Sequence, residues 1–441
     1  MSIPVAPGRW VLFGHTPSML RRRVDFTSSL RAYGDIVRVH LGPMRTFFLT
    51  NPELVHQTLV TKAASFEKGA FFDMFRPYVG NGIIMSNGDF HRRQRRLVQP
   101  AFHRAKLAGY AETMRRVSAD VAGSWKPGQE LEDLYSHMYH LSVTTVGETL
   151  FSTELGKRAI AEARRSIPVV LRDGVVRVLS PSILNRVPII PANRRFDQAS
   201  GRIHRVVLDV IRAWRADGRD RGDLLSMLLL ARDEDTGEAM SDQQVFDEVL
   251  NLFIAGSETS GLALTWLFHQ FAENPDVERR VRDEMDQVLA GRPITFDDVP
   301  KMQYTRQVIN EVLRMYPIWF VMRRARTDVE IGGEHMRAGT EFIISPHAMH
   351  YDPRSYPEPD RFDPDRWTPE RTAALPKGSF IPFGAGSRQC VGNSYAYTEM
   401  TIAVATILAR WRLVAVPGKP VLTKVNAVLY PSPVAMTAVP V

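Results

Sequence analysis

The only cysteine of the 441-residue chain, Cys390, lies in a glycine-rich segment that reads FIPFGAGSRQCVG. Glycines allow tight turns and a close approach of the backbone to another group. A helix is predicted to begin just after the cysteine, and the amides at a helix N-terminus, together with Arg388, stabilise a thiolate. These residue types suit metal binding or nucleophilic chemistry. The alternatives are a small buried hydrophobic residue and a Cys-His nucleophile, for which no local signature is present.

The spacing of this segment resembles the haem-binding loop of the cytochrome P450 superfamily, Phe-x-x-Gly-x-Arg-x-Cys-x-Gly. The matching positions are Phe383, Gly386, Arg388, Cys390 and Gly392. The resemblance implies that Cys390 is the axial ligand of a haem iron and that Phe383 and Gly384 lie against the haem. A thiolate in this position donates electron density that favours cleavage of the O–O bond.

A second match lies in NEVLRMYP, where Glu311 and Arg314 share one helix face at i,i+3 spacing. Taken alone, this is an ordinary surface ion pair. The resemblance implies that both residues join Arg361, from the downstream PDRF, in a buried structural network that holds the cysteine loop. Breaking such a network would leave a buried charge uncompensated. The family usually has Glu where Asp360 stands here.

A third match, AGSETS, lies at the centre of a long predicted helix. The positions that fit the family pattern are Ala255, Gly256, Glu258, Thr259 and Ser260. The resemblance implies that Ala255 and Gly256 lie against the haem, that Thr259 holds a water molecule, and that Glu258 relays protons as a general acid. Without the resemblance, a Ser/Thr cluster in a helix predicts hydroxyl bonds back to carbonyl groups and a local bend. Both are compatible, and we expect a widened turn at this point.

Cationic side chains are expected to hold the haem propionates. In HRRQRR, His91 and Arg95 are one helical turn apart, so both can face the same way. The resemblance implies a propionate role for these two, for Arg323 in MRRARTDVEIGG and for Arg388 in the cysteine loop. Arginine suits carboxylates because its fork is planar and permanently charged. Arg324 is the alternative to Arg323, and His91 is alternatively a solvated helix residue.

The elements that must position these residues are mainly helical, with a minor β part (α+β). IVRVHLG (36–42) and TFFLTN (46–51) predict a hairpin. A helix that begins with the capping box Ser241–Gln244 is predicted to run to Asn274-Pro275. A last long helix is predicted over about residues 392–411. The β-rich stretches are expected at about 30–60, 320–350 and 412–441.

The matches follow the family's order and cover essentially the whole chain. The resemblance therefore implies a single cytochrome P450 domain over residues 1–441. It also implies the family's fold, a triangular helical prism with haem between the long central helix and the cysteine loop.

Composition limits the other possibilities. A single cysteine excludes an intramolecular disulfide framework, and no apolar run is long enough for a signal peptide or a membrane span. We therefore expect a soluble, cytoplasmic protein, most simply a monomer. The net charge of +8 favours an acidic partner, but the basic residues are spread along the chain, so nucleic acid is not expected.

The resemblance implies a monooxygenase that contains haem b and places one atom of O2 into substrate. The chain shows no flavin, nicotinamide or ferredoxin motif, so NAD(P)H electrons are expected to arrive through a ferredoxin reductase and a ferredoxin. Rival readings are a peroxide-driven hydroxylase, an isomerase or a dehydratase, against which Glu258 and Thr259 count. A non-catalytic haem sensor or carrier is the rival from another class.

The segments that form the family's substrate pocket are apolar here, which favours an apolar ligand. They include GAFFDMF (69–75), IWFVM (318–322) and NAVLY (426–430). The side chains expected to line the pocket are Phe71, Phe72, Phe75, Phe253, Ile318, Phe320 and Val428. Ordinary core packing is the alternative for each.

The chain is most similar in general character to actinobacterial terpene oxygenases such as the pentalenene oxygenases. The leading hypothesis is therefore hydroxylation or stepwise oxidation of a cyclic, sesquiterpene-like terpene in secondary metabolism, including antibiotic biosynthesis. Tailoring of a macrolide or another polyketide by hydroxylation or epoxidation is the second hypothesis, and fatty acid or steroid hydroxylation the third.

Overall fold

A computed structural model describes residues 3–151, 154–179, 190–425 and 428–441. They form two compact units, each assembled from separate stretches of chain. Unit 1 comprises Met1–Met74, Asn310–Cys390 and Thr423–Tyr430; unit 2 comprises Phe75–Ile309, Val391–Leu422 and Pro431–Val441. The single domain expected over 1–441 stays a prediction.

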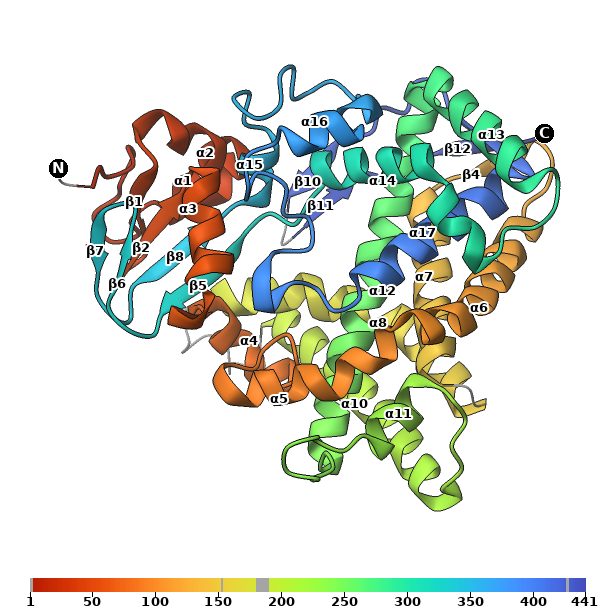
Figure 1. Cartoon of the computed structure of the whole chain (residues 1–441), viewed down its shortest axis with the longest axis horizontal. Coiled ribbons are helices and arrows are strands. Elements are labelled where there is room, and N and C mark those ends of the chain that lie inside the picture. Colours follow the sequence, from red (N-terminus) through yellow and green to blue (C-terminus); the bar gives the residue numbers. More distant parts are fainter. Residues whose placement is uncertain (1–2, 152–153, 180–189, 426–427) are drawn as a thin grey trace. The chain divides into compact units, whose positions relative to one another are not determined.

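Unit 1 is built on a five-stranded sheet in the order β1-β2-β8-β5-β3 (Figure 1). The strands are β1 (Ile36–Leu41), β2 (Met44–Leu49), β8 (Glu341–Ile344), β5 (Val321–Ala325) and β3 (Phe66–Lys68). The predicted hairpin is confirmed, since β1 pairs antiparallel with β2 and Leu41 faces Met44. Only the β2–β8 pair of this sheet is parallel.

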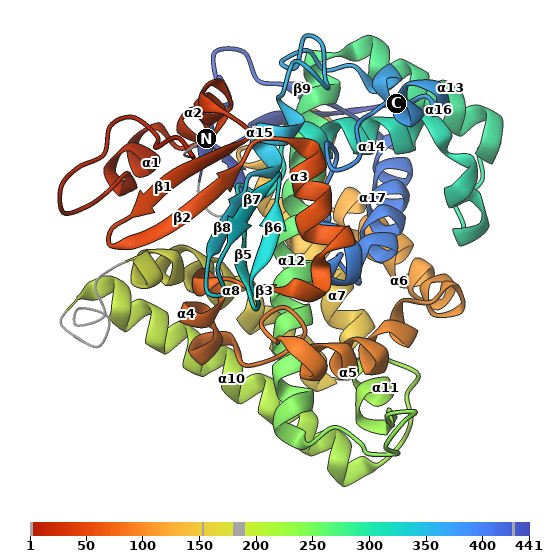
Figure 2. The same ribbon diagram turned by 60° about the vertical axis from the view of Figure 1, so that its left-hand side comes forward.

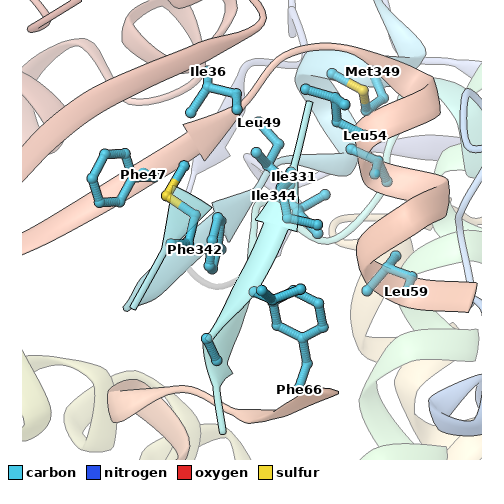
Figure 3. Close-up of a cluster of buried hydrophobic side chains, with 14 of the residues drawn as sticks. Ile36, Phe47, Leu49, Leu54, Leu59, Phe66, Ile331, Phe342, Ile344 and Met349 are labelled. Carbon is cyan, nitrogen blue, oxygen red and sulfur yellow. The ribbon is translucent and has the colours of Figure 1, made fainter. Parts of the chain in front are cut away.

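The two faces of this sheet bury separate apolar clusters, as the alternation of side chains along a strand requires. Phe47 and Leu49 of β2 join one cluster, whereas Phe48 between them joins the other. On the first face, helix α3 (Pro52–His56) and the π-turn that follows it contribute Leu54 and Leu59. Figure 3 shows these side chains packed against the strands. The cluster fixes Leu59, whose carbonyl oxygen matters for the cysteine loop below.

The remaining elements of unit 1 are short. The helices are α1 (Thr16–Arg22), α2 (Val24–Ser29), α15 (Pro346–His350) and α16 (Pro369–Ala373). The strand pairs are β6 (Val329–Ile331) with β7 (Glu334–Met336), and β10 (Thr423–Val425) with β11 (Leu429–Pro431). Two helices, α4 (Ala70–Val79) and α14 (Gln303–Met315), contain the points where one unit passes into the other.

Unit 2 is mainly helical. Its helices are α5 (Gly88–Val98), α6 (Arg104–Gly123), α7 (Leu134–Leu150), α8 (Glu154–Leu179), α10 (Pro191–Asp217), α11 (Leu224–Leu230), α12 (Asp242–Glu273), α13 (Pro275–Leu289) and α17 (Asn393–Leu408). A small sheet has the order β4 (Glu130–Leu131), β12 (Met436–Pro440) and β9 (Trp411–Ala415). β3 and β4 fall outside the stretches expected to be β-rich, because strands of two or three residues carry no alternation to detect.

The long predicted helix is confirmed as α12, which packs beside α7 (Figure 2). Its capping box is formed, with the Ser241 hydroxyl accepting from the Gln244 amide. Ser257 and Thr259 donate their hydroxyls to the carbonyls four residues earlier, as the alternative reading predicted. The expected widened turn is wrong, because the helix is α-helical from Asp242 to Glu273.

Two glycines let α12 approach α7 closely. A Cβ at Gly256 would lie 2.7 Å from Cγ2 of Val146, and one at Gly261 would lie 3.0 Å from Cα of Tyr139. The first distance is shorter than real Cβ contacts allow, and the second would press on the backbone of α7. The glycine of AGSETS therefore allows this close helix packing, and the expectation that it also lies against the haem stays a prediction.

Burial makes two carboxyl groups of unit 2 hold their protons to unusually high pH. Glu399 on α17 is fully buried beside Ser260 and Ser142, and Glu248 on α12 accepts from the Ile83 amide at 2.9 Å. Desolvation raises the pKa of each to about 8. In the unfolded chain these groups ionise near pH 4.5. Their contribution to stability is therefore complete below about pH 4.5 and is lost as the pH rises toward 8.

Glu399→Gln is expected to flatten part of this dependence and to stabilise the protein near pH 8. Each group lowers the free energy of unfolding by up to about 1.4 kcal/mol per pH unit in this window, and glutamine keeps the shape without an ionisable proton. Urea unfolding at a series of pH values from 5 to 9 measures the effect. The exposed Glu132→Gln is the control. An unchanged slope in Glu399→Gln would contradict the assignment.

Candidate active site

The cysteine loop is closed by its own backbone. The amide of Cys390 donates to the carbonyl of Phe383 at 2.9 Å, around a 3-10 turn at Gly386–Arg388. Gly386 has φ +67°, and any side chain there would clash with the carbonyl oxygen of Leu59. The Cys390 side chain is exposed at the end of this loop. The loop thus presents a thiol at a fixed position in unit 1, so a structural, buried cysteine is excluded.

Three cations of unit 1 converge near this thiol. Lys68 on β3 lies directly opposite Arg323 on β5, and like charges in that position destabilise a strand pair. Burial and the charges of Arg323 and Arg388 hold the pKa of Lys68 well below its usual value, while Cys390 opposes this shift. Burial and Arg388 likewise lower the pKa of Arg323 to about 10. Such a cluster suits a ligand that carries carboxylates.

The neighbouring arginine is used differently. Arg324 forms ion pairs with Glu341 at 2.7 Å, Asp73 at 2.8 Å and Glu67 at 3.3 Å. Its charge is therefore neutralised within unit 1. Between the two candidates raised by the sequence, Arg323 is the one whose charge is available to an anion.

A buried charge network lies behind the loop. Glu311 and Arg314 of α14 have no exposed surface and form a bidentate pair at 2.8 and 2.9 Å. Glu311 also accepts from Arg366 at 3.3 Å and from the Trp367 indole at 3.0 Å. The amide of Asp363 donates to the same carboxylate at 2.9 Å. Glu311 thereby fixes the segment 363–367, which precedes the cysteine loop in the sequence.

Arg361 is not the third charge of this network, which corrects the prediction. Its side chain is exposed and pairs with Glu358 at 3.5 Å; only its carbonyl accepts from Arg314, at 3.4 Å. The sequence contains Pro-Asp-Arg-aromatic twice, at 359–362 and 364–367. The second copy forms the turn that buries Arg366 and Trp367. The pattern alone could not choose between the copies.

His350, which the sequence did not single out, connects the network to the loop. Its backbone carbonyl accepts from Arg314 at 3.0 Å, and its Nδ1 lies 3.1 Å from the Arg314 carbonyl. Its Nε2 accepts from the Ile381 amide at 3.0 Å. Burial and Arg314 lower the pKa of His350 to about 3, so the ring is neutral and can accept this bond. Ile381 stands two residues before Phe383, where the loop begins.

In unit 2, α5 carries His91 and Arg95 on one face. His91 is buried and Arg95 half-buried. The outer arginines of HRRQRR are engaged elsewhere: Arg96 pairs with Asp233 at 2.9 Å and Arg93 with Glu238 at 3.3 Å. These pairs neutralise the charge of two arginines of the basic cluster. They also fix the rotation of α5 about its axis, so the face that carries His91 and Arg95 keeps one orientation.

The loop before α5 is anchored on the first turns of α12. Asp247 accepts from the Asn81 amide at 2.8 Å, and Asn251 accepts from the Ile84 amide at 3.2 Å. The Asn251 amide also donates to the Val79 carbonyl at 2.7 Å. These bonds satisfy the backbone of a segment that has no secondary structure, so α5 starts from a fixed point.

The centre of α12 offers one accessible strip. Thr259 is exposed, and Leu252, Ala255 and Gly256 are partly exposed at helical spacing. Glu258 faces another way: it is buried, and its Oε1 accepts from the hydroxyl of Tyr135 on α7 at 2.8 Å. Tyr135 is half-buried. The acid and the alcohol of AGSETS therefore occupy different sides of the helix, and Tyr135 stands between the acid and solvent.

Comparison with known proteins supports what the loop and the network indicate. The family model described as Cytochrome P450 matches residues 4–438. This chain belongs to the cytochrome P450 family. It is accordingly an oxidoreductase of the monooxygenase type, whose chemistry requires haem, O2 and electrons from a reductant.

Several curated relatives of this P450 come from Streptomyces. It is 43% identical over 416 residues to a cyclooctat-9-en-7-ol 5-monooxygenase of Streptomyces melanosporofaciens, covering 94% of this chain and 90% of the relative. It is 39% identical to a cyclooctatin synthase of the same species, covering 99% and 95%. It is 37% identical to a pentalenene oxygenase of Streptomyces avermitilis, covering 96% and 94%.

The residues of each unit fit a haem. Unit 1 supplies an exposed thiol on a fixed loop and a group of cations suited to propionates, the half-buried Lys68 and the buried Arg323 among them. Unit 2 supplies the accessible strip of α12 ending at Thr259. Lys68 was missed by the sequence analysis because it is an isolated cation on a three-residue strand, where no pattern marks it.

The expected substrate-lining residues divide between the units. In unit 1, the rings of Phe71 and Phe320 pack edge-on with their centroids 5.4 Å apart. The backbones of Ile318 and Val428 form an isolated antiparallel β-bridge. These side chains, with Phe72, are only partly buried. Of NAVLY, Asn426 and Ala427 lie outside the described residues.

The two expected lining residues of unit 2 are buried. Phe75 is 6% exposed, and Phe253 has no exposed surface and packs edge-on against Phe151 at 5.5 Å. Phe253 is thus a core residue in this structure, and the prediction that it lines a pocket is not supported. The sequence around a single apolar residue in a buried helix does not indicate whether its side chain packs in the core or lines a pocket.

Proposed function

We propose that this P450 is a haem-thiolate monooxygenase that hydroxylates or stepwise oxidises a cyclic terpene. The observation that carries the reaction type is the exposed Cys390 thiol on a fixed loop, with the cations Lys68, Arg323 and Arg388 near it. The substrate class rests on the relatives, because the three described above are named for cyclooctatin-type or pentalenene chemistry.

Cys390 would bind the haem iron through its thiolate. Lys68, Arg323 and Arg388 would hold propionates, and the family pattern of HRRQRR assigns the same role to His91 and Arg95. When bound, the haem supplies the activation of O2. The protein's own residues orient the group, exclude water and deliver protons. The proposed group is haem b.

Glu258 would relay protons from solvent to the haem site, and Thr259 would hold the water molecule that receives them. Glu258 is buried and would reach solvent through Tyr135, whose hydroxyl holds its Oε1 at 2.8 Å. Tyr135 is thus a positioning residue for the acid. Thr259 donates to the Ala255 carbonyl, so its oxygen remains free to accept from a water molecule on the exposed side of α12.

Tyr135→Phe is expected to reduce the product formed per NAD(P)H by about tenfold, because the carboxylate loses the donor that orients it. More of the electrons would leave as hydrogen peroxide, and the solvent deuterium isotope effect would increase. Tyr139→Phe is a matched control, since its hydroxyl donates to the Ala163 carbonyl at 3.2 Å and its ring stacks on Tyr135. Equal coupling and isotope effects in Tyr135→Phe and wild type would contradict this role.

Electrons are proposed to come from NAD(P)H through a ferredoxin reductase and a ferredoxin, and the enzyme is proposed to act as a cytoplasmic monomer. The net charge of +8 suits an acidic carrier. Replacing the ferredoxin system by hydrogen peroxide tests this point. Turnover with the carrier system and little with peroxide supports a monooxygenase, whereas the reverse indicates a peroxide-driven enzyme.

The substrate class is tested by optical titration of the purified ferric protein with cyclic terpenes, macrolides, steroids and fatty acids. A ligand that excludes water from the haem shifts the main absorption band of the haem. A tight shift with a cyclic terpene, followed by an oxidised product, is the expected result. A shift with a macrolide and none with terpenes would overturn the substrate proposal and leave the monooxygenase assignment intact.

A further inference from the structure

The N-terminal part of unit 1 exposes a run of large apolar side chains. Trp10 and Phe13 are each 58% exposed, Leu12 is 78% exposed and Val11 is 95% exposed. A soluble protein rarely displays such side chains in succession without a partner. We call Arg9–Phe13 the apolar loop.

The apolar loop is a built structure. Trp10 and Gly14 exchange backbone hydrogen bonds at 2.8 and 3.0 Å, which closes the turn. His15, which follows, is fully buried; its Nε2 lies 2.8 Å from the Ala6 carbonyl and its Nδ1 accepts from the His40 amide at 2.9 Å. The fold therefore holds these apolar side chains outward against water.

Arginines are frequent in the loop, in the helix that follows it and in the neighbouring strands. The arginines involved are Arg9, Arg21, Arg22, Arg23, Arg38 and Arg45. Arg9, Arg38 and Arg45 all lower the pKa of His40, which places them around one point of β1 beside the loop. Arg21, Arg22 and Arg23 are exposed at the end of α1, the helix that follows the loop. The first acidic residue of the sequence is Asp25.

Within the described residues, none of these arginines forms an ion pair with a carboxylate. Arg23 donates to the Leu20 carbonyl at 3.3 Å, and Arg38 and Arg45 lie over the Phe47 ring at 6.0 and 5.1 Å. By contrast, Arg93 and Arg96 of α5 are paired with acids. An exposed apolar segment bordered by uncompensated cations is the pattern of a surface that binds lipid headgroups and acyl chains together.

We propose that the apolar loop and the arginines of α1 bind this protein peripherally to an anionic lipid bilayer. Trp10 and Phe13 would lie at the headgroup level, where aromatic rings are favoured, and Leu12 and Val11 would enter the acyl region. The arginines would contact lipid phosphates. The attachment is peripheral, since no helix among the described residues is long and apolar enough to cross a bilayer.

A bilayer fits better than a second copy of the chain. A symmetric dimer through this surface would bring the same arginines of both copies together, and like charges oppose such a contact. An anionic bilayer supplies the opposite charge and also accepts apolar side chains without a shaped groove. If the substrate is the apolar terpene proposed above, this attachment would keep the enzyme where that substrate partitions, but the surface itself does not depend on that function.

Flotation of the full-length protein with vesicles of phosphatidylcholine, with and without phosphatidylglycerol, tests the proposal. We expect binding to the anionic vesicles that weakens with salt. Val11→Ser/Leu12→Ser is expected to reduce the partition coefficient by about tenfold or more, from the burial that two such side chains lose. Arg21→Ser/Arg22→Ser is expected to do the same for anionic vesicles only.

Leu422→Ser is the matched control, because Leu422 is 64% exposed in unit 2, away from this sequence region. Brominated lipids are expected to quench the fluorescence of wild type but much less that of Trp10→Phe. All variants are expected to keep the haem spectrum of wild type. Flotation measures lipid binding and not oxidation, so the outcome of this test is independent of whether the proposed function is correct.

Three outcomes would overturn the proposal. They are no binding of wild type to anionic vesicles, binding that the Val11→Ser/Leu12→Ser variant retains in full, or a dimer in light scattering that this same variant abolishes. The last outcome would assign the surface to a second copy of the chain.

Discussion

Arg366→Met is expected to lower the free energy of unfolding by about 3–5 kcal/mol, whereas Arg361→Met is expected to change it little. Arg366 is 5% exposed and donates to Glu311, which has no exposed surface. Its removal would leave a buried carboxylate short of a partner in a site that water does not reach. Arg361 is exposed and pairs with an exposed Glu358, a contact typically worth under about 1 kcal/mol.

Chemical unfolding of both variants and wild type measures this difference. The two substitutions make the same change in two copies of one motif, so each controls for the other. We also expect Arg366→Met to retain less haem, since Glu311 and His350 hold the segment that leads into the cysteine loop. Similar losses in both variants, or a larger loss in Arg361→Met, would show that the network has been assigned wrongly.

Cys390→Ser is expected to abolish the thiolate-type absorption of the reduced, carbon monoxide-bound protein and to lower turnover at least about 100-fold. A hydroxyl is a far weaker donor of electron density than a thiolate. The cysteine is the only one in the chain, so no other sulfur can substitute. Folding should be little affected, because the side chain is exposed.

Gln389→Ser is the control for Cys390→Ser. It changes the adjacent exposed residue of the same loop and is expected to keep the thiolate spectrum. Circular dichroism would confirm that both variants are folded. A thiolate spectrum in Cys390→Ser would contradict the assignment of this residue as the iron ligand.

Features that depend on neighbouring residues could be predicted from the sequence. The capping box of α12 needs only Ser241 and Gln244, and the hairpin needs two β-rich runs around a Gly-Pro pair. The cysteine loop is similarly local, since its closing bond joins Phe383 to Cys390. In each case, the partners lie within a few residues, so the type and spacing of residues determine the structure.

Features that depend on distant partners could not be predicted. Tyr135 and Glu258 are separated by 123 positions, and nothing near either residue indicates that they meet. The choice of Arg366 over Arg361 depends on which of two similar tetrapeptides is buried under α14. Lys68 becomes significant only because the register of β3 and β5 places it opposite Arg323.

The most direct test of the central claim is turnover under ¹⁸O2 with a cyclic terpene, a ferredoxin, its reductase and NAD(P)H. The account predicts a product that carries one ¹⁸O atom per hydroxylation in wild type and almost none in Cys390→Ser. An oxidised product whose new oxygen comes from water or peroxide, with no label from O2, would contradict the assignment as a monooxygenase.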